Sequence, residues 1–121
     1  MEVLEVAKKL EQLIKKSNDI ISELPKLAEK CATAECIYEK QLAIIILKLK
    51  AGEEVELDGN KVVGVQVSLI EKVARGICAH LKLDYELYDK LHKGKIMELS
   101  MIKTQLMALM SINKHLDVNE L

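Results

Sequence analysis

Apolar residues recur at alternating spacings of three and four along the first fifty positions of the chain. The series comprises Val3, Val6, Leu10, Leu13, Ile20, Leu24, Leu27, Cys31, Ala34, Tyr38, Leu42, Ile45 and Leu49. Because an α-helix turns once in about 3.6 residues, these side chains share one helix face, which Ser17 alone interrupts. The pattern predicts a helix over about residues 2–50.

Pro25 lies inside this predicted helix. Proline has no backbone amide donor, and its ring collides with the preceding helical turn. The apolar series keeps its phase on both sides of Pro25, so we expect a kink or a short break rather than the end of the helix. Ser22 stands three residues earlier and could cap a new helix start.

The pattern changes over residues 52–67. Asp58-Gly59 is a tight-turn dipeptide between two short β-prone stretches, and four of the six residues 53–58 are acidic. The charged residues predict that the first arm is solvated on at least one side. We expect a small β-hairpin here, acting as an elbow between two helical regions.

A second helical region is predicted over about residues 68–115. Ser68 and Glu71 have the spacing of a capping box, in which each side chain satisfies a free amide at a helix start. The apolar stripe that follows comprises Ile70, Val73, Ile77, Leu81, Tyr88, Leu91, Leu99, Ile102, Leu106 and Leu109. Asp84 and Lys95 interrupt this stripe.

Two helices of these lengths do not fit into a sphere. A helix of about 48 residues is about 72 Å long, whereas a compact globule of this chain length is about 35 Å across. The predicted fold is therefore mainly α, a long antiparallel helical hairpin or an elongated helix bundle with a small β-hairpin elbow. We expect one helical domain over residues 1–121, and further chains to cover the surface that a two-helix hairpin leaves open.

The charge balance argues against binding that is driven by nucleic-acid phosphates. The chain has 18 basic and 19 acidic residues, which gives a net charge of -1. The one local basic cluster consists of Lys90, His92, Lys93 and Lys95. A solvated helix face explains this cluster better than a single-strand binding platform, because only two tyrosines lie nearby.

The lack of a visible secretory signal and the pattern of cysteines favour a cytoplasmic setting. The N-terminus shows no basic stretch followed by an apolar one, as a secretory signal would. The longest apolar run is six residues, over 42–47, far short of the roughly 20 that span a bilayer. Three cysteines without a CxxC pair are expected to be reduced thiols. We expect a protein of the cytoplasm that does not bind membranes.

The chain contains no HExxH, GxSxG, P-loop or GxGxxG motif. His80, His92 and His115 have no second ligand at helical spacing, and acidic pairs such as Glu35 and Glu39 sit among lysines. We therefore expect no enzyme activity, no catalytic or metal-binding residue and no cofactor. A metal-dependent nucleotide hydrolase is kept as an alternative.

The segment over residues 96–112 is apolar on more than one helix face. Methionine packs adaptably, which suits a subunit interface or a partner-binding surface. The candidate interface residues are Met97, Met101, Leu106, Met107 and Met110. The alternative is that these side chains form a purely intramolecular core.

Arg75 is the only arginine of the chain, and Gly76 follows it. A single guanidinium can bind a carboxylate or phosphate in a bidentate manner, and a glycine allows a partner to approach closely. Arg75 and Gly76 are therefore candidates for partner binding. The simpler interpretation is a surface ion pair between Arg75 and Glu71 one turn earlier.

Over residues 35–117 the chain resembles a group of short helical proteins encoded by phages and prophages of Gram-positive bacteria. The resemblance rests on short motifs spread over this range: Tyr38-Glu39, Leu42-Ala43, Leu47-Lys48-x-Lys50-x-Gly52-Glu53, Leu57-Asp58-Gly59, Ile70-Glu71-Lys72-x-Ala74-Arg75-Gly76-x-Cys78 and Ser111-Ile112-Asn113-Lys114-x-Leu116-Asp117. The resemblance implies a phage or prophage setting near replication and recombination genes, within a host bacterial cell. It carries over no catalytic residue.

These observations lead to three functional hypotheses. The first is a self-associating helical hairpin, with coiled-coil packing, that binds a host or phage protein of DNA metabolism or defence. The second is a nucleic-acid-binding accessory of phage recombination or replication that uses lysines along one helix face. The third is the nucleotide hydrolase. A salt-dependent shift of labelled DNA would favour the second hypothesis, and metal-dependent loss of a nucleoside triphosphate would favour the third.

Overall fold

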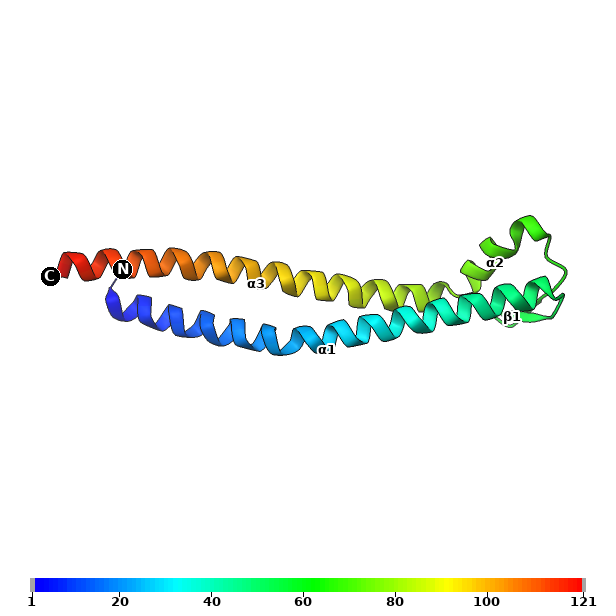
Figure 1. Ribbon diagram of the computed structural model, residues 1–121, viewed down its shortest axis with the longest axis horizontal. Helices are drawn as coiled ribbons and strands as arrows, with labels where there is room; N and C mark the ends of the chain where they lie inside the picture. Colours follow the sequence, from blue (N-terminus) through cyan, green and yellow to red (C-terminus); the bar gives the residue numbers. More distant parts are fainter. Residues whose placement is uncertain (1, 121) are drawn as a thin grey trace. The chain divides into compact units, whose positions relative to one another are not determined.

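A computed structural model describes the backbone of residues 2–120 and the side chains of residues 2–115. Its elements in chain order are helix α1 (Val3–Lys50), strands β1 (Val55–Leu57) and β2 (Asn60–Val62), a 3₁₀ turn η1 (Val67–Leu69), and helices α2 (Ile70–Ile77) and α3 (Ala79–Glu120) (Figure 1). Helices α1 and α3 pack against each other, and β1 and β2 form a two-stranded antiparallel sheet. The predicted mainly α hairpin with a small β element is confirmed.

The chain forms two compact units. Unit 1 comprises residues 1–28 and 90–121, and unit 2 comprises residues 29–89. Helices α1 and α3 each contribute to both units. Each unit has its own buried side chains and is described by itself below.

Helix α1 follows the predicted apolar series throughout. Every member of the series is buried or half-buried, and Ser17 within it is half-buried too. Val6 and Ile20 are the most completely buried members in unit 1. Burial of one continuous stripe explains why this long segment is helical, since packing of an amphipathic face supplies most of a helix's stability.

Helix α1 continues through Pro25, so this residue neither ends the helix nor breaks it, and the predicted kink stays a prediction. Leu24 and Leu27 lie on either side of it and are half-buried in the stripe. Their packing holds the chain helical although one amide donor is missing. Ser22 does not cap a new helix, since its hydroxyl donates to the Asp19 carbonyl at 2.8 Å.

In unit 1 the inward face of α3 differs from the predicted stripe. Leu91 is 52% exposed, and the half-buried positions are His92 and Lys95 instead. The spacing of three and four continues through Leu99, the buried Ile102, Leu106, Leu109 and Asn113. These inward residues of α3 and the α1 stripe from Val3 to Leu27 form the seam of unit 1. The helical phase thus turns the polar residues His92 and Lys95 toward the seam and Leu91 toward solvent.

Unit 2 has a core built from three elements and the residue that joins α2 to α3. Its buried residues are Tyr38, Ile45 and Leu49 of α1, Val55 of β1, Ile70 and Ala74 of α2, and Cys78. Leu42, which is half-buried, packs against this core. The α1 stripe changes to two successive spacings of four at Tyr38 and Leu42, which keeps it facing this core.

The β-hairpin has the turn that its sequence predicts. Val55 pairs with Val62 and Leu57 with Asn60, so that Asp58 and Gly59 are the two turn residues. Both have positive φ, 50° and 80°, as a type I′ turn requires. Asp58 tolerates this conformation, and Gly59 adopts it without a Cβ penalty.

Two details of the second helical region differ from the prediction. The helix is not continuous from residue 68, because α2 ends at Ile77 and α3 begins at Ala79. Cys78 between them has φ -92° and ψ 9°, a conformation outside the α-helical range, and its burial in the core fixes the chain there. The predicted capping box is also wrong: Ser68 lies in the 3₁₀ turn, and no side chain caps η1 or α2.

Candidate interaction surface

Unit 1 has a polar side, on which ion pairs join α1 to α3. Lys16 of α1 contacts Glu98 of α3 at 3.5 Å, and Glu23 of α1 contacts Lys95 of α3 at 3.5 Å. Lys95 also contacts Glu98 at 3.6 Å, so four side chains form one chain of alternating charges. These ion pairs show that α1 and α3 are antiparallel in unit 1, since the partner number falls as the α1 number rises.

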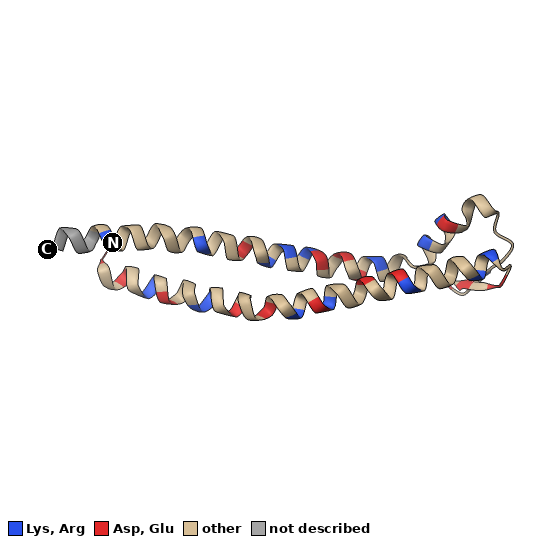
Figure 2. Ribbon diagram, in the orientation of Figure 1, with Lys and Arg blue, Asp and Glu red and all other residues tan. Residues whose placement is uncertain are grey.

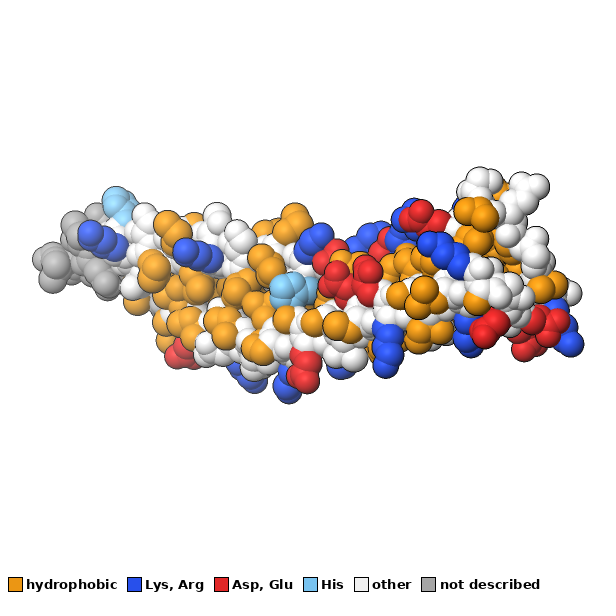
Figure 3. Space-filling model, turned by 45° about the vertical axis from the view of Figure 1, so that its right-hand side comes forward, with side chains coloured by type: hydrophobic (Ala, Val, Ile, Leu, Met, Phe, Trp, Pro, Cys, Tyr) orange, Lys and Arg blue, Asp and Glu red, His pale blue; other side chains and the backbone are white. Residues whose placement is uncertain are grey.

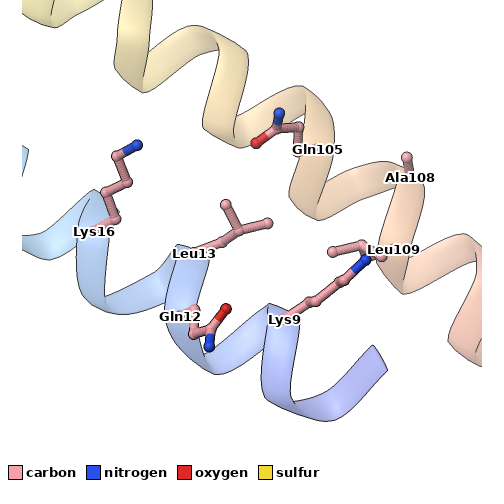
Figure 4. A pocket seen from close by; sticks show the side chains of 7 residues that line it. All are labelled: Lys9, Gln12, Leu13, Lys16, Gln105, Ala108 and Leu109. Atoms are coloured by element: carbon pink, nitrogen blue, oxygen red, sulfur yellow. The ribbon is translucent and has the colours of Figure 1, made fainter. Parts of the chain in front are cut away.

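A shallow groove of about 550 Å³ lies on this polar side. It is lined by Lys9, Gln12, Leu13, Lys16, Gln105, Ala108 and Leu109. Figure 4 shows Leu13 pointing from α1 toward α3, with Lys9 and Lys16 reaching across on either side of it. The lysine stems cover apolar seam residues while the ammonium groups stay in water, so the groove is the solvated edge of the seam.

The opposite side of unit 1 is apolar. In an antiparallel helix pair, the residues that directly follow every second inward position flank the seam on one side, which in unit 1 is the side away from the ion pairs. Here these residues are Ala7, Ile14, Ile21, Ala28, Ile96, Lys103 and Met110, and all are exposed. This set is the apolar side of unit 1. Lys103 is its single charged member.

Helix α3 carries a further uncharged face, on the side away from the seam. Exposed residues at spacings of three and four form it: Gly94, Met97, Met101, Thr104, Ala108 and Ser111. This set is the outer methionine face. Lys103 is the one charged residue over positions 99–113, as the long tan stretch of α3 in Figure 2 illustrates. On the face drawn in Figure 3, hydrophobic side chains gather over the two helices of unit 1.

The candidate interface residues fall into three places. Met97 and Met101 lie on the outer methionine face and are 67% and 62% exposed. Met110 belongs to the apolar side, and the exposed Met107 lies at its border with the outer face. Leu106 is half-buried in the seam, where it packs within the chain. All four methionines are thus exposed, on more than one side of α3, whereas the leucine is not.

Arg75 and Gly76 lie on α2 in unit 2. The Arg75 guanidinium donates to the Glu71 carboxylate at 2.6 Å, in the i,i+4 pair that the simpler interpretation predicts, and both side chains are more than half exposed. A Cβ added to Gly76 would meet no atom within 4 Å, so no element of the chain packs closely on it. Both residues are exposed, and the pair with Glu71 accounts for the Arg75 guanidinium.

Sequence reasoning missed the isoleucines that complete the apolar side. Ile14 and Ile21 are exposed on α1, seven residues apart, each one position after a seam residue. An isoleucine repeated every seven residues beside an apolar stripe indicates a second contact surface on the same helix. This signal is present in the sequence, and it extends the candidate surface from α3 to both helices.

The cysteines differ in their exposure to solvent. Cys36 is exposed, whereas Cys78 is 1% exposed, and burial raises the pKa of the Cys78 thiol. Over residues 2–115, whose side chains the structure describes, no three histidine, cysteine or acidic side chains come together as metal ligands would. Within the same residues, no helix combines the length and the apolar character needed to cross a lipid bilayer.

Comparisons of the chain with protein-family models, with curated proteins and with solved structures gave no match. The exposed surface of unit 1 is therefore the feature of the chain that bears on its function.

Proposed function

We propose that this protein is a self-associating interaction module of the phage or prophage type, which binds a host or phage protein of DNA metabolism or defence in the bacterial cytoplasm. The observation that carries the proposal is the exposed methionine-rich surface of α3. Soluble monomers rarely expose contiguous apolar patches, and patches that are exposed commonly mark interaction sites. The phage setting is supported by the resemblance over residues 35–117.

The outer methionine face is the proposed binding surface for the partner protein. Met97 and Met101 are its two large side chains and its other members are small, so a partner helix can approach the α3 backbone closely. Methionine side chains adapt their shape to the surface that covers them. The face has no charge of its own, which favours an apolar helix face as the partner's contribution.

The nucleic-acid-binding alternative has less support. His92 and Lys95, two of the four members of the basic cluster, lie half-buried in the seam of unit 1. Lys95 contacts Glu23 and Glu98 there, so its charge is directed at carboxylates of the same chain. A nucleotide hydrolase is not proposed, because the described residues offer no cluster of metal ligands on which to argue it.

Affinity capture from a phage-infected host lysate tests the proposal. Tagged wild-type protein should retain a specific protein, identified by mass spectrometry. Met101→Lys should abolish this capture, because a charge on the outer methionine face must lose its water when a partner covers it. The control Met101→Leu keeps an apolar side chain and should retain the partner. Equal capture by wild type and Met101→Lys would contradict the proposed surface.

A further inference from the structure

The two sides of unit 1 differ in polarity, and this difference indicates what covers the apolar side. The polar side is closed by ion pairs within the chain, whereas the apolar side presents Ile14, Ile21, Ile96 and Met110 to solvent. We propose that a second copy of this chain covers the apolar side, with α1 of each copy lying against α3 of the other in a four-helix arrangement. This inference rests on the self-association proposed above and adds its surface, orientation and register.

The register follows from the ion pair between Lys16 and Glu98. Glu11 precedes Lys16 by five residues on α1, and Lys103 follows Glu98 by five residues on α3. Because the helices are antiparallel and rise equally per residue, Glu11 and Lys103 lie at the same level along unit 1. Glu11 lies at the outer border of the apolar side on α1, and Lys103 lies on that side on α3.

A two-fold axis parallel to the helices would bring the charges of Glu11 and Lys103 from different copies together. Such an axis places α1 of one copy opposite α3 of the other, antiparallel and at an unchanged level. Glu11 of each copy then faces Lys103 of the other, so the contact forms twice. Among the described residues, no ion pair joins Glu11 to Lys103 within one chain. The two charges are thus available to a second copy.

The same pattern argues against other occupants. An anionic lipid surface favours basic residues along the border of an apolar face, whereas here α1 contributes an acidic border residue. An unrelated helix needs complementary charges of its own, whereas a second copy brings both of them at the right level. The apolar residues are likewise shared between α1 and α3, as the self-complementary surface of a two-fold interface requires.

Paired charge variants test the arrangement in the full chain. Glu11→Lys leaves two lysines at each contact, and Lys103→Glu leaves two glutamates. Each single variant should dimerise at least about fivefold more weakly than wild type, because two attractive pairs become repulsive. An equimolar mixture of the two variants restores both contacts in the heterodimer only, so heterodimers should exceed the statistical half. The double variant Glu11→Lys/Lys103→Glu should regain the wild-type dissociation constant.

Sedimentation equilibrium and fluorescence energy transfer between differently labelled variants measure these outcomes. Lys15→Glu, a charge change on the solvent face of α1, is the matched control and should dimerise as wild type does, and circular dichroism confirms that every variant is helical. A wild-type dimer whose variants show no heterodimer preference would overturn this arrangement and leave self-association standing. A wild-type protein that stays monomeric would overturn both proposals.

Discussion

Glu23 on α1 contacts Lys95 on α3 at 3.5 Å, at a point where the seam of unit 1 holds a lysine instead of an apolar residue. Lys95 keeps 34% of its side chain exposed and also contacts Glu98 at 3.6 Å. A polar residue at a single inward position commonly fixes the register of a helix pair at some cost in stability. Lys95 has the position and the partners for this role.

This role predicts opposite effects for two substitutions at position 95. Lys95→Glu places a third carboxylate beside Glu23 and Glu98 and should lower the free energy of unfolding by about 1–3 kcal/mol. Lys95→Met removes the desolvation cost of the charge and should leave stability unchanged or raise it. Urea denaturation measures both. The control Lys90→Glu, at an exposed position, should have little effect; a loss as large as that of Lys95→Glu would contradict the role.

Leu106 and Met107 are neighbours in sequence that the structure places in different environments. Leu106→Glu puts a carboxylate into the seam and should destabilise the fold by about 2–4 kcal/mol. Met107→Glu puts the same group on the exposed surface and should leave the unfolding midpoint of the monomer nearly unchanged while it weakens association. Thermal denaturation at low protein concentration separates the two effects. Equal loss of stability in both variants would show that Met107 is also packed within the chain.

Gly59 and Gly76 form a matched pair for testing backbone conformation. An added Cβ would meet no atom within 4 Å at either position, so steric contact is absent from both. Gly59 has φ 80°, and Gly59→Val should therefore destabilise the protein by more than about 1 kcal/mol. Gly76 lies in α2 without a positive φ, and Gly76→Ala should stabilise it by about 0.5–1 kcal/mol. If both substitutions shifted the denaturation midpoint in the same direction relative to wild type, this account would be contradicted.

Cys78 should be the slowest thiol to react. Burial raises its pKa above the ordinary value of 9.0, which lowers the thiolate fraction at any given pH. Cys36 is exposed and should be alkylated first by iodoacetamide in the folded protein. Mass mapping of the labelled peptides over time checks the order; early labelling of Cys78 would show that the core of unit 2 opens readily.

The same pKa shift sets the sign of a pH effect. A thiol with a raised pKa in the folded state binds its proton more tightly there than in the unfolded chain, so its contribution to stability is complete below pH 9.0. This contribution is lost as the pH rises through the folded-state pKa. Cys78→Ala, which has no proton to lose, should show a weaker decline in stability above pH 9 than wild type.

Much of the helical hairpin follows from the sequence. The α1 stripe and the Asp58-Gly59 turn are local patterns, and each is realised as predicted because one face of a helix and one turn type satisfy it. Leu91 and Ser68 were predicted incorrectly, and the short break considered at Pro25 does not occur, for a common reason. At each of them, packing of distant residues outweighs the local preference, which a pattern along the chain does not contain.

The candidate surface was predictable only in part. The methionines of α3 are visible in the sequence as an excess of apolar residues on one helix. The seven-residue spacing of Ile14 and Ile21 is also present in the sequence, but which side of the helix pair the two residues share with α3 follows only from the ion pairs. The placement of Leu106 in the seam likewise depends on helical phase relative to a partner helix, and composition does not reveal that phase.

The molecular mass in solution tests the central claim, that another chain covers the apolar side of unit 1. Sedimentation equilibrium of the wild-type protein in the micromolar range should give twice the chain mass of 13.6 kDa. Met110→Glu, which places a charge on the apolar side, should shift the mass toward a single chain while circular dichroism stays unchanged. A wild-type mass of 13.6 kDa at every concentration, or a dimer that Met110→Glu does not weaken, would contradict the claim.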